Sequence, residues 1–343
     1  MKPPKSRLNL DALIFAIGDV LVDVSRSYRE VVRQTVQLYL EQAVGLPPSK
    51  EPLLTLEEVT TLQKIGNFTN FCDLATALIT YFVELLPPVP SPTFPSRYHV
   101  PAIMAYLQLA GGRLQIGIDR LREQKDIARL ARETAAAGGG PQAADDILPR
   151  LNRHLLVEGG EITRANLVGR IFQELYLGAE LFEHTYRQPP VVVQVSGYIQ
   201  HESLLIDPRL LAQLCEHLPL GVVANASRVE VENSLRANQI GQYFQTVITL
   251  DEVGAAGAEP IPAPWALLEA ARRLQPTPAH SAYVGATPAD IQAAWAANNT
   301  VPFAAIGCLT GAIDQDALRQ EFERAKAGII LGHPDHLKEL IFD

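Results

Sequence analysis

Long apolar runs are absent from this sequence, and cysteine and basic residues are scarce. No window approaches the roughly 18 uninterrupted apolar residues of a membrane span, although 47% of the residues are hydrophobic. The cysteines Cys72, Cys215 and Cys308 are far apart and odd in number, which argues against a disulfide framework or a zinc site. The net charge of −9 disfavours nucleic acid and anionic membranes as partners. These absences predict a globular protein of the reducing cytoplasm.

A secretory signal is not expected either. The segment 1–7 is basic and contains proline, but Asn9 and Asp11 interrupt the apolar core that a signal peptide requires. The length of 343 residues predicts one large domain or two ordinary ones.

Short apolar runs near both ends of the chain predict a parallel α/β sheet. Ser227-x-x-Glu230 and the Thr287–Asp290 segment are typical starts of the helices between these runs. Alternation of strand and helix at short spacing is typical of parallel sheets. The run 12–17 must join the others, because an isolated strand leaves its backbone groups unpaired. The predicted strands are residues 12–17, 221–225, 246–250, 281–285, 303–307 and 328–331.

The middle of the chain predicts a mostly helical insertion. Capping signatures at Ser27 and Thr55 predict helices that begin just after them, the first reaching about residue 43. Apolar residues recur at helical spacing in two later segments, 113–136 and 163–186.

Prolines and glycines predict the connections and the boundaries of this insertion. Six prolines make residues 87–101 a rigid extended connection, and the glycines of 138–141 predict a flexible joint. The expected division is an α/β core of residues 1–22 and 188–343, with a helical insertion of residues 23–187.

Four motifs in this order resemble the haloacid dehalogenase (HAD) superfamily, in the subgroup whose cap follows the first strand. Each motif is weak alone, but all four stand on the expected strand or turn. The resemblance implies a Rossmann-like parallel sheet with an enlarged helical cap, in an uncharacterised phosphatase-like subgroup. The motifs are Ala12–Asp23, Leu220–Arg228, Pro262–Trp265 and Tyr283–Asp290.

The resemblance also implies a reaction whose chemical groups are missing here. Family phosphatases use an aspartate nucleophile, a second aspartate as acid and base, a hydroxyl and a lysine that hold the phosphoryl group, and acids that bind Mg²⁺. No lysine lies between Lys125 and Lys326. We therefore expect no catalytic residue, no bound metal and no cofactor. The corresponding positions hold Ala16, Gly18, Ala224, Ile261 and Ala286.

Several polar residues remain candidates for a ligand-binding pocket. Parallel sheets form a crevice at the carboxyl ends of their strands whether or not chemistry occurs there, and helix N-termini attract anions. The alternative is that Thr287 and Asp290 only cap a helix, that the two arginines are ordinary solvated residues, and that Asp19 is a turn residue. The six candidates are Asp19, Arg26, Asn225, Arg228, Thr287 and Asp290.

Three functions remain open from the sequence. The leading hypothesis is a pseudophosphatase that acts by binding a partner protein or a small phosphorylated ligand in regulation, scaffolding or metabolite sensing. The second is an active Mg²⁺-dependent hydrolase that uses displaced acids such as Asp19, Asp23 or Asp290. The third is a structural subunit or assembly factor of a larger complex.

Overall fold

The computed structural model describes residues 10–91, 99–312 and 314–342. The chain divides into two compact units, an α/β unit of residues 1–24 and 201–343 and a helical unit of residues 25–200. The amino-terminal segment 1–7 and the middle of the proline-rich connection, residues 92–98, lie outside the described residues. No helix in the described part of the chain is long and apolar enough to cross a membrane.

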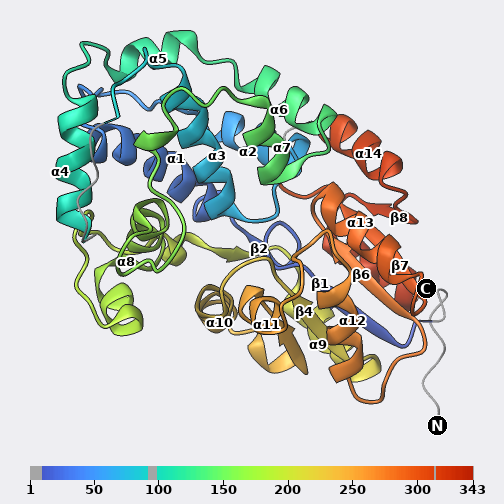
Figure 1. Cartoon of the computed structure of the whole chain (residues 1–343). Helices are drawn as coiled ribbons and strands as arrows, with labels where there is room; N and C mark the ends of the chain where they lie inside the picture. Colours follow the sequence, from blue (N-terminus) through green and yellow to red (C-terminus); the bar gives the residue numbers. More distant parts are fainter. Residues whose placement is uncertain (1–9, 92–98, 313, 343) are drawn as a thin grey trace. The chain divides into compact units, whose positions relative to one another are not determined.

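The α/β unit is built on a parallel sheet of six strands in the order β5-β4-β1-β6-β7-β8 (Figure 1). The first strand, β1, lies between β4 and β6, with Leu13 beside both Leu220 and Ala282. This arrangement confirms the predicted fold class and the predicted place of the first strand. The strands are β1 (Ala12–Phe15), β4 (Leu220–Val223), β5 (Thr246–Ile248), β6 (Ser281–Gly285), β7 (Phe303–Cys308) and β8 (Ile329–Leu331).

Burial on both faces explains why the sheet strands are continuous apolar runs. All four residues of β1 are inaccessible to solvent. Ala12 and Ile14 belong to a hydrophobic core cluster that also contains residues of α12 (Trp265–Arg273) and α13 (Pro288–Ala297), whereas the Phe15 ring contacts that of Phe244 at 6.2 Å between centroids. Strand β1 ends at Phe15, two residues earlier than predicted, because the chain turns at residues 17–22, where three successive N–H groups donate to the Ile17 carbonyl.

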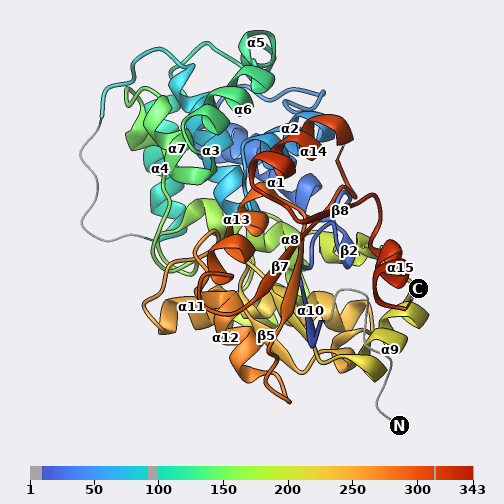
Figure 2. The same cartoon turned by 90° about the vertical axis from the view of Figure 1, so that its right-hand side faces the viewer.

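Helices α12 and α13 pack against the sheet and against each other (Figures 1 and 2). Helix α13 lies beside β6 and β7, and α12 lies beside β4, β5 and β1. The predicted helix starts at Ser227 and Thr287 are confirmed, because each side chain accepts a hydrogen bond from a first-turn N–H group. Asp207 caps α9 in the same way. The helices of this unit are α9 (Pro208–His217), α10 (Arg228–Ala237), α11 (Leu250–Ala255), α12 (Trp265–Arg273), α13 (Pro288–Ala297), α14 (Gln315–Arg324) and α15 (Leu337–Ile341).

A two-stranded antiparallel ribbon marks the point where the helical unit enters and leaves the α/β unit. Strand β2 (Val22–Asp23) pairs with β3 (Ser203–Leu204), with Val22 opposite Leu204. The chain ends that flank the insertion are therefore adjacent, as an insertion into an intact sheet requires.

The helical unit contains eight α-helices and a π-helical turn in the described part of the chain. Thr55 and Glu58 form the predicted capping box. Ser27 does not form its predicted cap: its side chain makes no capping hydrogen bond, and Glu30 binds Arg33 and Gln34 instead. The helices are α1 (Tyr28–Leu38), α2 (Leu56–Ile65), α3 (Phe71–Glu84), α4 (Val100–Gly111), α5 (Ile118–Gln124), α6 (Ile127–Ala136), α7 (Gly140–Ile147) and α8 (Leu167–Tyr186), with the π turn at Tyr39–Ala43.

The glycine-rich joint and the charged segment differ in detail from the predictions. The charged segment 113–136 forms two helices, because Lys125 and Asp126 adopt non-helical backbone angles between α5 and α6. The glycines at 138–140 all have positive φ, and the third already begins α7.

The division after Gln200 differs from the boundary expected at residues 187 and 188. The β-branched run at 191–195 forms no strand. Its first three N–H groups donate instead to the buried carboxylate of Glu174 in α8, at 2.8, 2.8 and 2.9 Å. This contact keeps the run in the helical unit.

Candidate functional site

The carboxyl ends of β1, β4 and β6 meet at one edge of the sheet, and each is followed by an alanine. Ala16 follows β1, and its N–H group donates to the Val284 carbonyl at 2.9 Å. Ala224 follows β4, and its N–H group donates to the Ile248 carbonyl at 3.0 Å. Ala286 follows β6 and is buried. Three neighbouring strand ends therefore carry a methyl group, which neither attacks phosphorus nor binds a cation.

The other two positions without reactive groups also serve the fold. Gly18 forms an isolated bridge with Val22 in the turn after β1. Ile261 is 7% exposed and belongs to the same hydrophobic cluster as Ala12 and Ile14, where a lysine ammonium would be costly to bury.

Asp19 lies in the turn after β1 in a left-handed conformation. Its φ is +61°, a region that aspartate and asparagine adopt more readily than most residues. The side chain is 1% exposed, and its carboxylate lies against Gly311, where an added Cβ would come within 2.5 Å of Oδ1. Gly311, in the turn after β7, thus leaves room for the carboxylate. In the sequence, the only sign that residue 311 leaves room for Asp19 is that it is a glycine.

Asp290 is surrounded by donors from its own helix and from β6. Its Oδ2 accepts hydrogen bonds from the N–H groups of Ala286 and Thr287 at 3.0 and 2.9 Å and from the Thr287 hydroxyl at 2.8 Å. Its Oδ1 accepts a hydrogen bond from the Tyr283 hydroxyl at 3.0 Å. Burial raises the pKa of Asp290, and these hydrogen bonds oppose the shift.

Tyr283 is the site residue that the sequence analysis overlooked. It lies in β6 and is 1% exposed. Its burial and the neighbouring Asp290 carboxylate raise the pKa of the phenol well above its usual value, so the hydroxyl keeps its proton and donates. A tyrosine in an otherwise apolar buried strand was the available signal, since buried tyrosine hydroxyls usually find a partner.

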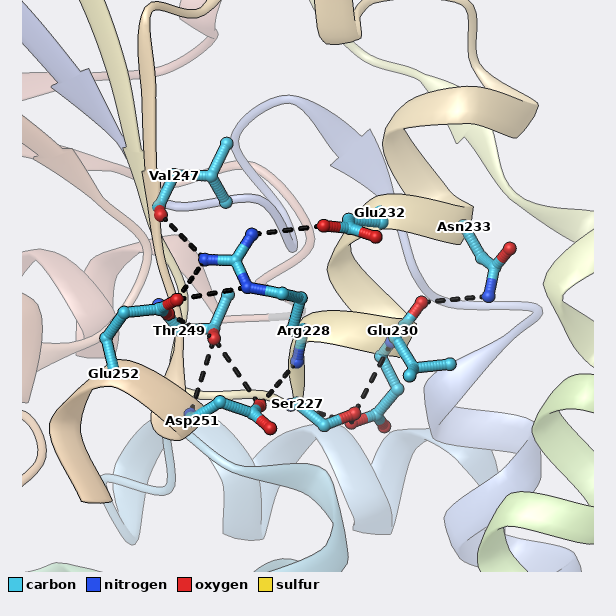
Figure 3. A network of polar contacts seen from close by, with 10 residues as sticks. Ser227, Arg228, Glu230, Glu232, Asn233, Val247, Thr249, Asp251 and Glu252 are labelled. Carbon is cyan, nitrogen blue, oxygen red and sulfur yellow. Dashed lines mark hydrogen bonds and ion pairs between the residues drawn. The ribbon is translucent and has the colours of Figure 1, made fainter. Parts of the chain in front are cut away.

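Arg228, at the start of α10, is held by carboxylates (Figure 3). Its Nε donates to Glu252 at 3.0 Å and its Nη1 to Glu232 at 3.1 Å, while a second nitrogen also contacts Glu252. Its backbone N–H donates to Asp251 at 2.7 Å. An anion at this guanidinium would compete with two carboxylates that already neutralise it.

Glu252 also caps the next helix, α11. Its Oε2 accepts from the Thr249 N–H and hydroxyl at 2.9 and 2.6 Å (Figure 3). Burial opposes ionisation of this carboxyl, but hydrogen bonds from Thr249 and Arg228 outweigh it and lower its pKa to about 2. Glu252 therefore stays ionised and keeps Arg228 engaged.

The remaining two candidates are Asn225 and Arg26. Asn225 is half-buried, two residues beyond the end of β4. Arg26 is exposed and belongs to the helical unit, whereas the other five candidates belong to the α/β unit.

The donor set at the strand edge does not fit the Mg²⁺ site that the HAD resemblance implies. Mg²⁺ requires near-octahedral oxygen coordination, but Ala16, Gly18 and Ala286 have no side-chain oxygen. Of the acids expected in the family motifs, Asp290 is the one that remains, and it already accepts four hydrogen bonds. Within the described ranges, no group of three or more His, Cys, Asp or Glu side chains is arranged to hold a metal ion.

Comparisons with known proteins agree with this architecture. Residues 208–305 match the family model of the haloacid dehalogenase-like hydrolases. The X-ray structure of a Northeast Structural Genomics Consortium target is similar over 96% of this chain and 97% of its own, with a TM-score of 0.57 and 17% identity.

Two further solved structures align more loosely. Phosphatase Tt82 from Thermococcus thioreducens has a TM-score of 0.48 and 20% identity, covering 91% of this chain and 99% of its own. A haloacid dehalogenase-like protein of unknown function from Agrobacterium tumefaciens has a TM-score of 0.45 and 13% identity, covering 96% of each chain. No curated protein matches the sequence significantly. The chain thus has the haloacid dehalogenase-like fold, and its α/β unit carries the match to that family.

Proposed function

We propose that this protein is a catalytically inactive member of the HAD fold that acts by binding. The observation that carries the proposal is that β1, β4 and β6 are directly followed by Ala16, Ala224 and Ala286. Catalytic groups in such centres act as a unit, so the loss of several removes far more rate than the loss of one. A folded protein that lacks the catalytic side chains can still bind another molecule through its surface.

A partner protein is the occupant that we favour over a small phosphorylated ligand. The guanidinium of Arg228 is engaged by Glu252 and Glu232. The N-termini of α10, α11 and α13 are each capped by an acid of their own first turn, Glu230, Glu252 and Asp290. A phosphate group would have to displace these carboxylates, whereas a partner protein could bind without reaching the carboxyl ends of the strands.

The test is hydrolysis of an aryl phosphate and a panel of sugar phosphates by the purified full chain with Mg²⁺. We expect the rate to equal that of buffer. Turnover that requires Mg²⁺ would contradict the proposal. The variant Ala16→Asp, Gly18→Asp and Ala286→Asp, which returns three carboxylates, shows in parallel whether phosphate esters still reach the strand edge.

The partner is tested separately, by purification from the native source. We expect a second protein to co-purify in a constant ratio through two unrelated chromatography steps. A chain that emerges alone, as a monomer or homodimer, would argue against a stable partner and against a structural subunit of a larger assembly.

The second candidate is a hydrolase that uses displaced acids. Two observations favour it: the family that matches residues 208–305 is described as hydrolases, and Asp19 lies in the turn directly after the central strand. If wild type is active, Asp19→Asn should reduce the rate at least 100-fold. An unchanged rate in that variant would exclude this version of the chemistry.

A further inference from the structure

Asp290 occupies the position of a family metal-site acid, but its carboxylate serves the protein interior. It is 5% exposed and lies at the first turn of α13. A carboxylate has about four lone-pair sites, and Asp290 accepts four hydrogen bonds. Three of these bonds reach Oδ2, and the single bond to Oδ1 comes from the Tyr283 hydroxyl, so a cation at Oδ1 would have to share that oxygen with Tyr283.

Tyr283 and Gly285 hold this carboxylate in place from the strand side. The Tyr283 hydroxyl reaches Oδ1 from β6, with the Val223 carbonyl 3.5 Å away. A Cβ added at Gly285 would stand 2.2 Å from the Asp290 Cβ, so only glycine permits this close approach. The acid is thus clamped between its own helix and the strand that precedes it.

The four donors provide the stabilisation that a buried carboxylate otherwise lacks. Burying an anion is costly unless hydrogen bonds or a counter-charge compensate for the lost water. Two of the donors are N–H groups at the α13 N-terminus, where the helix dipole also favours negative charge. A cation is therefore not needed for this carboxylate to stay inside the protein.

We infer that the Tyr283–Thr287–Asp290 cluster replaces the divalent-cation site of the fold, so that the α/β unit is stable without Mg²⁺ and does not bind it. The inference rests on the proposed function, because both concern the edge of the sheet where the carboxyl ends of β1, β4 and β6 are followed by alanines. It goes further because it states that the Tyr283 hydroxyl binds the Asp290 carboxylate where a metal ion would otherwise bind it.

The first experiment is thermal unfolding of the EDTA-treated full chain with increasing MgCl₂, at constant ionic strength maintained with NaCl. We expect no change in Tm and no binding heat in calorimetry. An ion bound at about 100 times its Kd would raise Tm by roughly 5 °C. A saturable rise that disappears in Asp290→Asn would overturn the inference.

The second experiment tests the role of the Tyr283 hydroxyl. The variant Ala16→Asp, Gly18→Asp and Ala286→Asp is compared with the same variant carrying Tyr283→Phe, and Mg²⁺ affinity is measured by calorimetry. Removal of the hydroxyl leaves one Asp290 oxygen open, so we expect about tenfold tighter binding. Equal affinities would overturn the inference. Tyr243→Phe in the same background is the control and should change nothing.

These readouts separate the inference from the proposed function. Mg²⁺ binding without phosphatase activity would overturn the inference and leave the proposed function standing. Mg²⁺-dependent phosphatase activity of wild type would overturn both. Hydrolysis that is unaffected by EDTA would contradict the proposal that the protein is catalytically inactive but would leave the inference about Mg²⁺ standing.

Discussion

Thr287 and Asp290 cap helix α13 with their side chains, and both are nearly fully buried. The Thr287 hydroxyl donates to Asp290 at 2.8 Å, and the two residues form a reciprocal capping box. The presence of these two residues, which match a family motif, can therefore be explained by the need to cap one helix.

Removal of the Thr287 hydroxyl should measure this requirement. We expect Thr287→Val to lower the free energy of unfolding by about 1–2 kcal/mol, because the cap is lost while the shape is kept. Thr287→Ser retains the hydroxyl and should lose less than half as much. Urea denaturation of both variants provides the comparison, and equal losses would show that the methyl group matters more than the cap.

Glu252 makes the stability of the α/β unit depend on pH. Its pKa is about 2 in the folded protein, below the usual glutamate value of 4.5, so its ionised form stabilises the fold. This contribution is complete above pH 4.5 and is lost as the pH falls towards 2.

We expect Glu252→Gln to be less stable than wild type at pH 7 and to lose less stability between pH 4.5 and 2. Urea unfolding at several pH values measures this difference. Glu259→Gln, which removes an exposed acid, is the control and should follow the wild-type profile. Parallel profiles for Glu252→Gln and wild type would contradict the assignment.

Among the elements, helix α8 shows how one glycine allows a kink. Gly178 has φ 77° and ψ 170° within α8, and a Cβ there would stand 2.2 Å from the Gly197 nitrogen. The bend permits an isolated bridge between Gly178 and Ser196, so the chain that follows the helix returns along it.

Gly178→Ala should destabilise the protein by more than about 1 kcal/mol, through backbone strain and collision with residue 197. The matched variant is Gly254→Ala in α11, where an added Cβ meets no atom within 4 Å. That change should stabilise the protein by up to about 1 kcal/mol. Thermal unfolding of the two variants should show opposite shifts, and shifts of the same sign would refute this account of the kink.

Glu174 organises the segment that follows the kinked helix. Its carboxylate is fully buried, pairs with Arg170 at 2.7 Å and accepts the N–H groups of residues 191–193. The β-branched run therefore satisfies its backbone through one side chain instead of a neighbouring strand. Local propensity for strand was overridden by a contact about 17 residues away in sequence.

At the scale of the whole molecule, the chain consists of two units joined at a two-stranded ribbon. Asn152 links two segments within the helical unit: its amide nitrogen donates to the Val83 and Leu86 carbonyls, and its oxygen accepts from the Val89 N–H group. Such internal hydrogen bonding is typical of a unit that folds by itself.

We expect residues 25–200, produced alone, to give a helical far-UV circular dichroism spectrum and a cooperative thermal transition. The counterpart joins residues 1–24 to 201–343 through a short Gly-Ser linker, which the adjacent ends of β2 and β3 permit. A helical unit that melts without a cooperative transition would show that it depends on the α/β unit for its fold.

Much of the fold was predictable because its signals are local. Apolar runs located the strands, and the capping boxes at Thr55, Ser227 and Thr287 located helix starts within one residue. The failed cap at Ser27 has the same sequence pattern, but Glu30 binds Arg33 and Gln34 instead. A pattern cannot indicate which of two competing partners a side chain will choose.

The sequence by itself determined the order of strands and helices, the insertion after the first strand and the alanines at the strand ends, because these depend on residue type and spacing. Only the tertiary structure decided which polar side chains remain available. It placed Arg228 between two carboxylates and the Tyr283 hydroxyl on Asp290. The physical reason is that hydrogen bonding and burial depend on neighbours brought together by folding, and these neighbours come from different strands and helices.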